Sequence, residues 1–209
     1  MLIIGAGGFA LQLFDDLIAA KNNDIVFWSD METKFSCLKD HFKILSSDEQ
    51  VADYFTNIST AFAVGIWDID DRKNLTKKFT DLGGILTPFI SPYSHLSTYT
   101  SVGAGSIVLY KTASEPYVEI GENCIINKKI SFGHGAKVGS FCSIGPHTLI
   151  ASDTEIGEGT YIGMRAVIQP KVKIGKNVIV ASGTVVTKNI ADNAVINGNP
   201  AKIRFFKKV

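Results

Sequence analysis

The sequence predicts an α/β domain followed by a left-handed parallel β-helix. In the first 88 residues, short aliphatic runs alternate with stretches of helical periodicity, as in a small parallel sheet covered by helices. From Ile90 to Val186, an apolar residue then recurs at every sixth position, with Ser114 as the one polar exception. These patterns predict domain boundaries at 1–88 for the α/β domain and 89–190 for the β-helix, with 191–209 as a C-terminal cap.

The N-terminal region begins as a strand, a glycine turn and a helix. Leu2–Ile4 is a short aliphatic run, Gly5–Gly8 follows it, and apolar residues at helical spacing extend from Phe9 to Ala20. A second strand over Ile25–Phe27 ends near Asp30, about 20 residues beyond the glycines, where an acidic side chain often binds a ribose. The arrangement is Rossmann-like and suits a nucleotide.

The remaining N-terminal elements complete a small sheet but not a full dinucleotide fold. They are, in order, a helix from Ser47 through Tyr54 with Ser47 and Gln50 as a capping box, a strand over Ala61–Gly65, and a helix from Asp70 or Asp71 to the residue before Gly83. The region before Pro88 is too short for two mononucleotide-binding halves, which disfavours NAD. The glycines could instead bind a smaller anion at the helix N-terminus, or serve turn geometry alone.

The six-residue repeat predicts a triangular coil. An α-helix has a period of 3.6 residues and an ordinary strand a period of two, so a fixed period of six requires three short flat faces. Three hexads make one turn, and residues eighteen apart stack in adjacent coils roughly 4.8 Å apart. Cys124 and Cys142 occupy the same inward position one coil apart, so we expect buried packing thiols. One interior ladder consists of Val102, Ile120, Val138, Ile156 and Ile174.

Composition narrows the partners and the compartment. With 21 basic and 20 acidic residues, no charge excess points to nucleic acid or to an anionic membrane surface. No apolar run approaches the roughly 18 residues of a membrane span. Three cysteines without a close-spaced motif suggest free thiols in a reducing compartment, so we expect a cytoplasmic protein.

Among the four histidines, His134 is the best candidate for chemistry. His41 is expected at the surface, and His95 lies in the first coil. His134 and His147 are off the apolar ladder and should both point outward, and the glycines on either side of His134 leave its ring accessible. A zinc site of three converging imidazoles is not expected, because these two histidines lack a third at stacking distance.

The whole chain resembles the bacterial sugar acyltransferases that join a Rossmann-like N-terminal domain to a left-handed β-helix. This group includes sialic acid O-acetyltransferases and the N-acetyltransferases of nucleotide-linked 4-amino-4,6-dideoxy sugars. The resemblance rests on the glycine turn with Asp30, the hexapeptide repeat, His134 within 127–141, and the segment Gly198–Lys202. It implies an acetyl-CoA-dependent enzyme, and a homotrimer that binds acetyl-CoA between neighbouring β-helices, with active sites at the subunit interfaces.

The resemblance also implies roles for individual residues. His134 matches the family's catalytic base, which takes a proton from the sugar amine as it attacks the thioester, and Asn127 matches an asparagine near that amine. The implied substrate-binding residues are Gly7, Gly8, Phe9 and Asp30. The implied coenzyme A-binding residues are Ser152, Ser182 and Gly183 along the pantetheine, and Pro200 and Lys202 near the adenine.

Two departures from the family pattern bear on the site. Many members have a histidine in the glycine turn, where this chain has Phe9. The residue after the catalytic histidine is usually Asp or Glu, and here it is Gly135. Stacking by eighteen places Asp153 over Gly135 in the next coil, which makes Asp153 a candidate for the missing orienting carboxylate. The alternative interpretation of Asp153 is a solvated corner residue.

We therefore expect N-acetylation of the 4-amino group of a UDP- or dTDP-linked 4-amino-4,6-dideoxy sugar, for the biosynthesis of a surface polysaccharide such as an O-antigen. Asp30 and the intact glycine turn favour a nucleotide-linked acceptor over the first alternative, O-acetylation of a sialic acid or another sugar. A second alternative is a non-catalytic β-helix in which Gly135 marks a lost active site. The sequence does not choose among uracil, thymine and guanine.

Overall fold

The N-terminal domain is a five-stranded parallel sheet with helices. We describe a computed structural model, which covers residues 1–19 and 24–207. The strand order is β3-β2-β1-β4-β5, and every pair is parallel. The strands are β1 (Leu2–Ile4), β2 (Val26–Trp28), β3 (Ile44–Leu45), β4 (Ala61–Val64) and β5 (Ile85–Leu86). The helices are α1 (Gly8–Ala19), α2 (Ser36–His41), α3 (Asp48–Asn57) and α4 (Ile69–Asp81).

The elements expected in this domain are present, with small shifts and three additions. Ser47 caps α3 by accepting a hydrogen bond from the Gln50 amide, and the Gln50 side chain accepts from the Ser46 amide instead of closing the box on Ser47. Helix α4 begins one residue earlier than expected, because the Asp68 carboxylate accepts from the amides of both Asp70 and Asp71. The short elements α2, β3 and β5 were not expected. Ala20, the expected end of the first helix, lies outside the described residues.

The second half of the chain is a parallel β-helix with three sheets. Sheet I contains β6 (Phe89–Ile90), β9 (Ile107–Val108), β12 (Ile125–Ile126), β15 (Ser143–Ile144), β18 (Tyr161–Ile162), β21 (Ile179–Val180), β23 (Ala194–Asn197) and the antiparallel β24 (Lys202–Phe206). Sheet II contains β7 (His95–Leu96), β10 (Ala113–Ser114), β13 (Ser131–Phe132), β16 (Leu149–Ile150), β19 (Val167–Ile168) and β22 (Val185–Val186). Sheet III contains β8 (Ser101–Val102), β11 (Glu119–Ile120), β14 (Lys137–Val138), β17 (Glu155–Ile156) and β20 (Lys173–Ile174).

The register follows the period of eighteen. Ile120 pairs with Val138, and Val138 pairs with Ile156, so the expected ladder is continuous through the coils. Glycines after these aliphatics let adjacent coils approach: a Cβ on Gly157 would lie 2.5 Å from the backbone carbon of Gly175. Each coil has three turns, which we name corner I/II, corner II/III and corner III/I after the sheets they join.

The β-helix core is a column of aliphatic side chains with buried hydroxyls and thiols. Cys124 and Cys142 are both buried free thiols, as expected. Each sulfur contacts a backbone carbonyl of the next coil, fifteen residues further along the chain. Buried hydroxyls do the same, for example Thr112, which donates to the Asn127 carbonyl. In the C-terminal segment, Ala194 and Ile196 join this column, while β24 is exposed.

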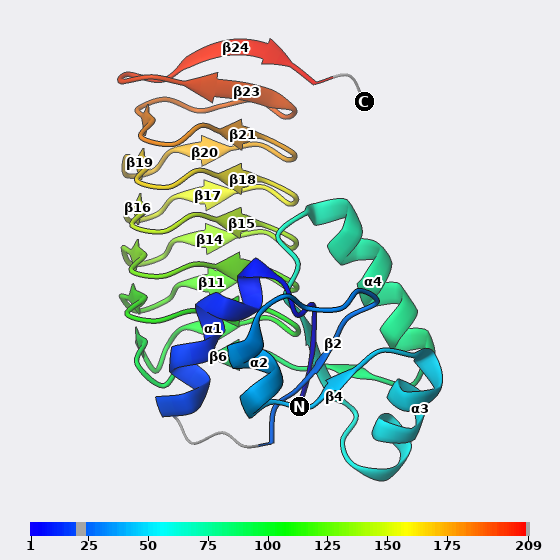
Figure 1. Ribbon diagram of the computed structural model, residues 1–209. Helices are drawn as coiled ribbons and strands as arrows, with labels where there is room; N and C mark the ends of the chain where they lie inside the picture. Colours follow the sequence, from blue (N-terminus) through cyan, green and yellow to red (C-terminus); the bar gives the residue numbers. More distant parts are fainter. Residues whose placement is uncertain (20–23, 208–209) are drawn as a thin grey trace.

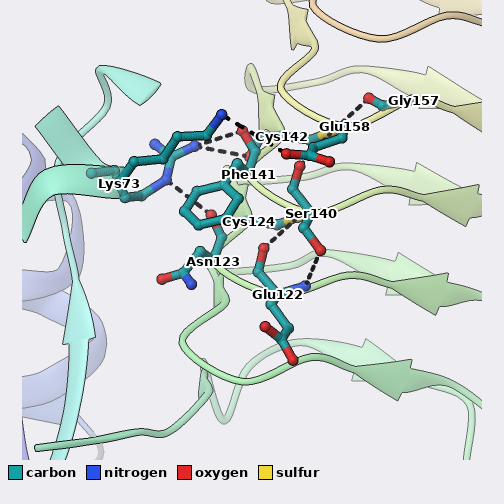
Figure 2. Close-up of polar contacts among 10 residues, drawn as sticks. Lys73, Glu122, Asn123, Cys124, Ser140, Phe141, Cys142, Gly157 and Glu158 are labelled. Atoms are coloured by element: carbon teal, nitrogen blue, oxygen red, sulfur yellow. Dashed lines mark hydrogen bonds and ion pairs between the residues drawn. The ribbon is translucent and has the colours of Figure 1, made fainter. Parts of the chain in front are cut away.

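The two domains pack through sheet I and corner III/I. Figure 1 shows the α/β domain beside the first coils, with β24 at the far end of the stack. Phe89, Ile107 and Leu109 lie in one buried cluster with Leu13 of α1 and Ile3 of β1. At corner III/I, Arg72 of α4 is fully buried, and its guanidinium donates to the backbone carbonyls of Asn123 and Phe141. Figure 2 shows these two turns, with Asn123 and Phe141 labelled. The sheet I face is thereby covered in the early coils.

Candidate functional site

The glycine turn opens onto a cavity of about 730 Å³. Gly5 has φ +111 and a close neighbour in Ile66, so glycine is required there for the turn itself. Gly7 and Gly8 differ, because a Cβ on either would meet nothing within 4 Å. Asp30, at the end of β2, lines the same cavity and is exposed. The turn at the start of α1 therefore leaves backbone amide groups accessible to an anionic ligand.

Phe9, the fourth residue expected to bind the substrate, is not among the residues that line this cavity. Its ring packs toward Gly65 and lies 6.5 Å, centroid to centroid, from the ring of Trp67. The structure thus brings together Gly7, Gly8 and Asp30 at the cavity. The Phe9 side chain instead packs against Gly65, outside the cavity.

A second cavity, of about 580 Å³, lies between the α/β domain and corner I/II. Asn127 lines it, and the Asn127 Nδ2 donates to Gln12 Oε1 of α1 at 2.9 Å. The Asn127 Oδ1 accepts from the amide of Lys128 at 2.7 Å, which fixes the side chain. The remaining lining residues are Trp67, Lys128, Lys129, Gly145, Pro146, His147, Tyr161 and Met164. The cavity combines aromatic rings, amides and cationic groups.

His134 lies at corner II/III, with its side chain 58% exposed. Its Nδ1 lies 3.0 Å from Glu115 Oε2, and its backbone N–H donates to the same oxygen at 2.8 Å. Ser152, in the next coil, places its Oγ 3.1 Å from Nδ1. The backbone and ring N–H groups of His134 lower the pKa of the Glu115 carboxyl below its usual range. A carboxylate thus faces Nδ1 at neutral pH.

Asp153 does not contact the His134 ring in this structure. Its Oδ1 lies where a side chain on Gly135 would begin, 2.6 Å from an ideal Cβ, and its backbone N–H donates to the His134 carbonyl. The carboxylate that holds the imidazole is Glu115, nineteen residues before His134. Glu115 was not identified from the sequence, because stacking by eighteen pairs His134 with residue 116 and says nothing of a side chain that bends toward its neighbour.

The residues expected to bind coenzyme A are divided between two corners. Ser182 and Gly183 lie at corner I/II. Pro200 lies in the turn between β23 and β24, and Lys202 is the first residue of β24. This turn stacks on β22, where Val185 N–H donates to the Gly198 carbonyl. Ser152 lies apart from them, at corner II/III beside His134.

His134 and Asn127 also lie at different corners, on the two edges of sheet II. His134 follows β13 and Asn127 follows β12, and His134 lines neither of the two cavities described above. One chain therefore does not assemble the expected base and the expected acceptor site in one place. The resemblance suggested both residues, but the sequence did not indicate that Trp67 and Tyr161 join Asn127, because the repeat does not reveal which corner meets the α/β domain.

Among residues 1–19 and 24–207, no group of three or more His, Cys, Asp or Glu side chains could hold a metal ion. No helix in those ranges is long and apolar enough to cross a membrane.

The later coils of the β-helix are similar to the hexapeptide-repeat transferases. The family model described as bacterial transferase hexapeptide (six repeats) matches residues 153–188, within the later coils. A comparison with curated proteins gives no significant match.

Solved structures match both domains. A histidine-to-asparagine variant of perosamine N-acetyltransferase from Caulobacter crescentus, in complex with CoA and GDP-perosamine, is 27% identical with a TM-score of 0.86, over 98% of this chain and 96% of the other. The acetyltransferase domain of PglB from Neisseria gonorrhoeae FA1090, in complex with acetyl coenzyme A, is 25% identical with a TM-score of 0.84, over 97% of each chain. WeeI from Acinetobacter baumannii AYE shares the fold, with 22% identity, a TM-score of 0.83, and coverage of 97% and 98%.

These likenesses confirm the expected resemblance to bacterial sugar acyltransferases. They also confirm the expected fold, a Rossmann-like α/β domain followed by a left-handed parallel β-helix. The similarity extends over nearly the whole chain and therefore includes both domains.

Proposed function

We propose that the protein is an acetyl-CoA-dependent acyltransferase that N-acetylates the amino group of a nucleotide-linked sugar. The observation that carries the proposal is that one chain joins a glycine-turn cavity suited to a nucleotide with a histidine at an exposed β-helix corner. The full-length similarity to a perosamine N-acetyltransferase bound to CoA and GDP-perosamine supports the same substrate class. Gly7, Gly8 and Asp30 hold the nucleotide, and the Asn127 cavity holds the amino sugar.

The chemistry is the attack of a neutral amine on a thioester. His134 Nε2 accepts a proton from the sugar amine as its nitrogen bonds to the acetyl carbonyl carbon, and backbone N–H groups stabilise the oxyanion. The carbon–sulfur bond then breaks, and the proton passes to the leaving thiolate, so the products are an amide and free coenzyme A. Asn127 orients the acceptor. Ser152, Ser182, Gly183, Pro200 and Lys202 are the proposed contacts for coenzyme A.

The separation of His134 from the Asn127 cavity supports a homotrimer with shared sites. Sheet II lies between these two positions. Apart from the exposed His95 in β7, its outward side chains are small or apolar, as expected for a face that contacts another subunit. They are Ala113, Ser131, Leu149, Val167 and Val185. Sheet III instead presents a ladder of opposite charges, with Glu119 bonded to Lys137 and Glu155 to Lys173, both at 2.9 Å. In the proposed trimer, His134 of one subunit serves the acceptor cavity of its neighbour.

We place the reaction in the cytoplasm, since the three free cysteines suit a reducing compartment. The candidate substrates differ in nucleobase and sugar. They are the UDP- and dTDP-linked 4-amino-4,6-dideoxy sugars expected from the sequence, and a GDP-linked amino sugar such as the ligand of the Caulobacter enzyme.

A thiol-release assay tests the proposed function. Acetyl-CoA is incubated with the protein and with UDP-, dTDP- and GDP-linked 4-amino sugars, with the 4-hydroxy analogues, and with free sialic acid. We expect release of coenzyme A with at least one amino sugar and formation of its N-acetyl product. Turnover of the hydroxy analogues or sialic acid alone would indicate O-acetylation, and no turnover with any acceptor would support a non-catalytic β-helix.

Gly7→Ala should weaken binding of the nucleotide sugar without loss of stability. A methyl group at this position would clash with no other part of the protein, but it would lie where the ligand approaches the amides of the turn. We therefore expect KM for the nucleotide sugar to rise by about tenfold. The melting temperature and KM for acetyl-CoA should stay unchanged. Gly5→Ala is the contrasting variant: φ +111 and Ile66 Cδ1 at 2.7 Å should make it unstable. A nucleotide KM that stays constant in both Gly7→Ala and Gly7→Val would contradict the assignment.

A further inference from the structure

The contact between His134 and Glu115 fixes the tautomer of the imidazole. Glu115 Oε2 lies 3.0 Å from Nδ1, and an ionised carboxylate can only accept hydrogen bonds. Nδ1 must therefore carry the proton in this contact, and the lone pair of the neutral ring lies on Nε2. No described residue hydrogen-bonds Nε2, which leaves that nitrogen free to act on a substrate.

Glu115 also fixes the position of the ring. The same Oε2 accepts a hydrogen bond from the backbone N–H of His134 at 2.8 Å. One carboxylate oxygen thus binds both the main chain and the ring of this residue. Both side chains are exposed to similar extents, 58% for His134 and 59% for Glu115. Packing alone therefore does not hold the ring. Its restraints are the two hydrogen-bond partners of Nδ1, Glu115 at 3.0 Å and the Ser152 hydroxyl at 3.1 Å, and of these only Glu115 also binds the backbone N–H of His134.

The position of Asp153 has a separate structural explanation. In three turns of the β-helix, two at corner III/I and one at corner II/III, a glycine with positive φ lies beneath an Asn or Asp of the next coil, whose own φ is also positive. In each pair, a Cβ on the glycine would come within 2.8 Å of the side-chain oxygen above it. The pairs are Gly105 with Asn123, Gly135 with Asp153, and Gly159 with Asn177. Asp153 thus repeats a feature that occurs where no histidine is present.

We propose that Glu115 is the positioning residue for His134, and that it supplies from the preceding coil the carboxylate that Gly135 lacks. It holds Nδ1–H, aims Nε2 outward, and stabilises the imidazolium that forms when Nε2 takes the proton of the amine. This inference rests on the proposed function for its catalytic meaning. Its structural content, the tautomer of His134, can be tested without any substrate.

The first test is the tautomer. In protein labelled with 15N-histidine, four histidines contribute ring signals, and His134→Gln assigns the one of interest. In the wild type we expect the Nδ1–H tautomer at a pH where the ring is neutral. In Glu115→Ala this preference should be lost, with a shift toward the Nε2–H form that predominates without a partner. An unchanged tautomer in Glu115→Ala would overturn the proposal, whether or not the protein is an acetyltransferase.

The second test is kinetic and uses the acceptor identified by the thiol-release assay. Glu115→Gln should lower kcat by about ten- to a hundredfold, less than the roughly 10²–10⁴ that a general base contributes, with little change in KM for either substrate. Glu119→Gln is the matched control, an exposed glutamate four residues away that pairs with Lys137 and should keep normal turnover. A normal kcat in Glu115→Gln and Glu115→Ala, or the same loss of kcat in Asp153→Asn but not in Glu115→Gln, would overturn the proposal.

Discussion

Replacing His134 with alanine should lower kcat by about 10²- to 10⁴-fold, the range that a general base contributes, while the fold persists. The side chain is 58% exposed and contacts Glu115 and Ser152 at the corner, outside the apolar column of the β-helix. Its loss therefore removes the base but little packing. Turnover is measured by thiol release with the best acceptor, and the melting temperature and sedimentation are measured in parallel. His41→Ala is the control, since His41 is exposed on α2 and contacts the Cys37 carbonyl.

Mixed oligomers extend this prediction to the sharing of the site. Gly7→Trp should fill the glycine-turn cavity without disturbing the fold, because a Cβ at this position would meet no atom within 4 Å beyond its chain neighbours. If His134 serves the acceptor cavity of a neighbouring subunit, co-expression of His134→Ala with Gly7→Trp should restore part of the activity that each variant lacks alone. Near-normal turnover of His134→Ala would refute its role as base. A mutant mixture that stays inactive, despite proven co-assembly, would argue against a site shared between subunits.

The β-helix could be predicted from the sequence because its order is local and periodic. The position of Val138 between Ile120 and Ile156 follows from counting, and so does the inward position of Cys142. The outward positions of His134 and His147 follow in the same way. The short elements of the α/β domain were harder, because β3 and β5 have two residues each and are defined by pairing with distant strands.

The candidate site was only partly predictable for a related reason. Asn127 and His134 follow from the resemblance, but their neighbours depend on how the domains dock and how side chains bend. Trp67 reaches the Asn127 cavity from a loop of the α/β domain, and its ring meets that of Tyr161 at 6.0 Å. Glu115 reaches His134 across a coil boundary. Neither contact is a consequence of a fixed spacing in the sequence, so both required the structure.

The docking of the two domains depends on a buried arginine that the sequence pattern does not reveal. Arg72, on α4, is fully buried. Among the described residues, no carboxylate lies within hydrogen-bond distance of its guanidinium. It donates instead to the carbonyls of Ile66, Asn123 and Phe141 at 2.7–2.9 Å. Burial lowers the pKa of Arg72 to about 10, which still leaves the group charged at neutral pH. The contact should therefore be independent of pH near neutrality.

Arg72→Met should lower the free energy of unfolding by about 3 kcal/mol, because it leaves one buried and two partly buried carbonyl oxygens without their donor at roughly 1–3 kcal/mol each. For a chain of this size, such a loss corresponds to a fall in melting temperature of about 6–12 °C, measured by calorimetry. Lys73→Met is the matched control on the same helix. Figure 2 shows Lys73 beside Phe141 and Glu158, and its ammonium lies 3.8 Å from the Glu158 carboxylate.

Comparison of Arg72→Met with Lys73→Met separates the loss of the contact between the domains from the loss of a surface charge. Lys73 and Glu158 are each more than 40% exposed, and exposed ion pairs contribute roughly 0–1 kcal/mol, so Lys73→Met should change the melting temperature by a few degrees at most. Equal effects of the two variants would contradict the role of Arg72. Because α4 follows the loop that places Trp67 in the Asn127 cavity, which we propose holds the amino sugar, Arg72→Met should also raise KM for the nucleotide sugar more than KM for acetyl-CoA. A stability loss without that difference would limit Arg72 to holding the domains together.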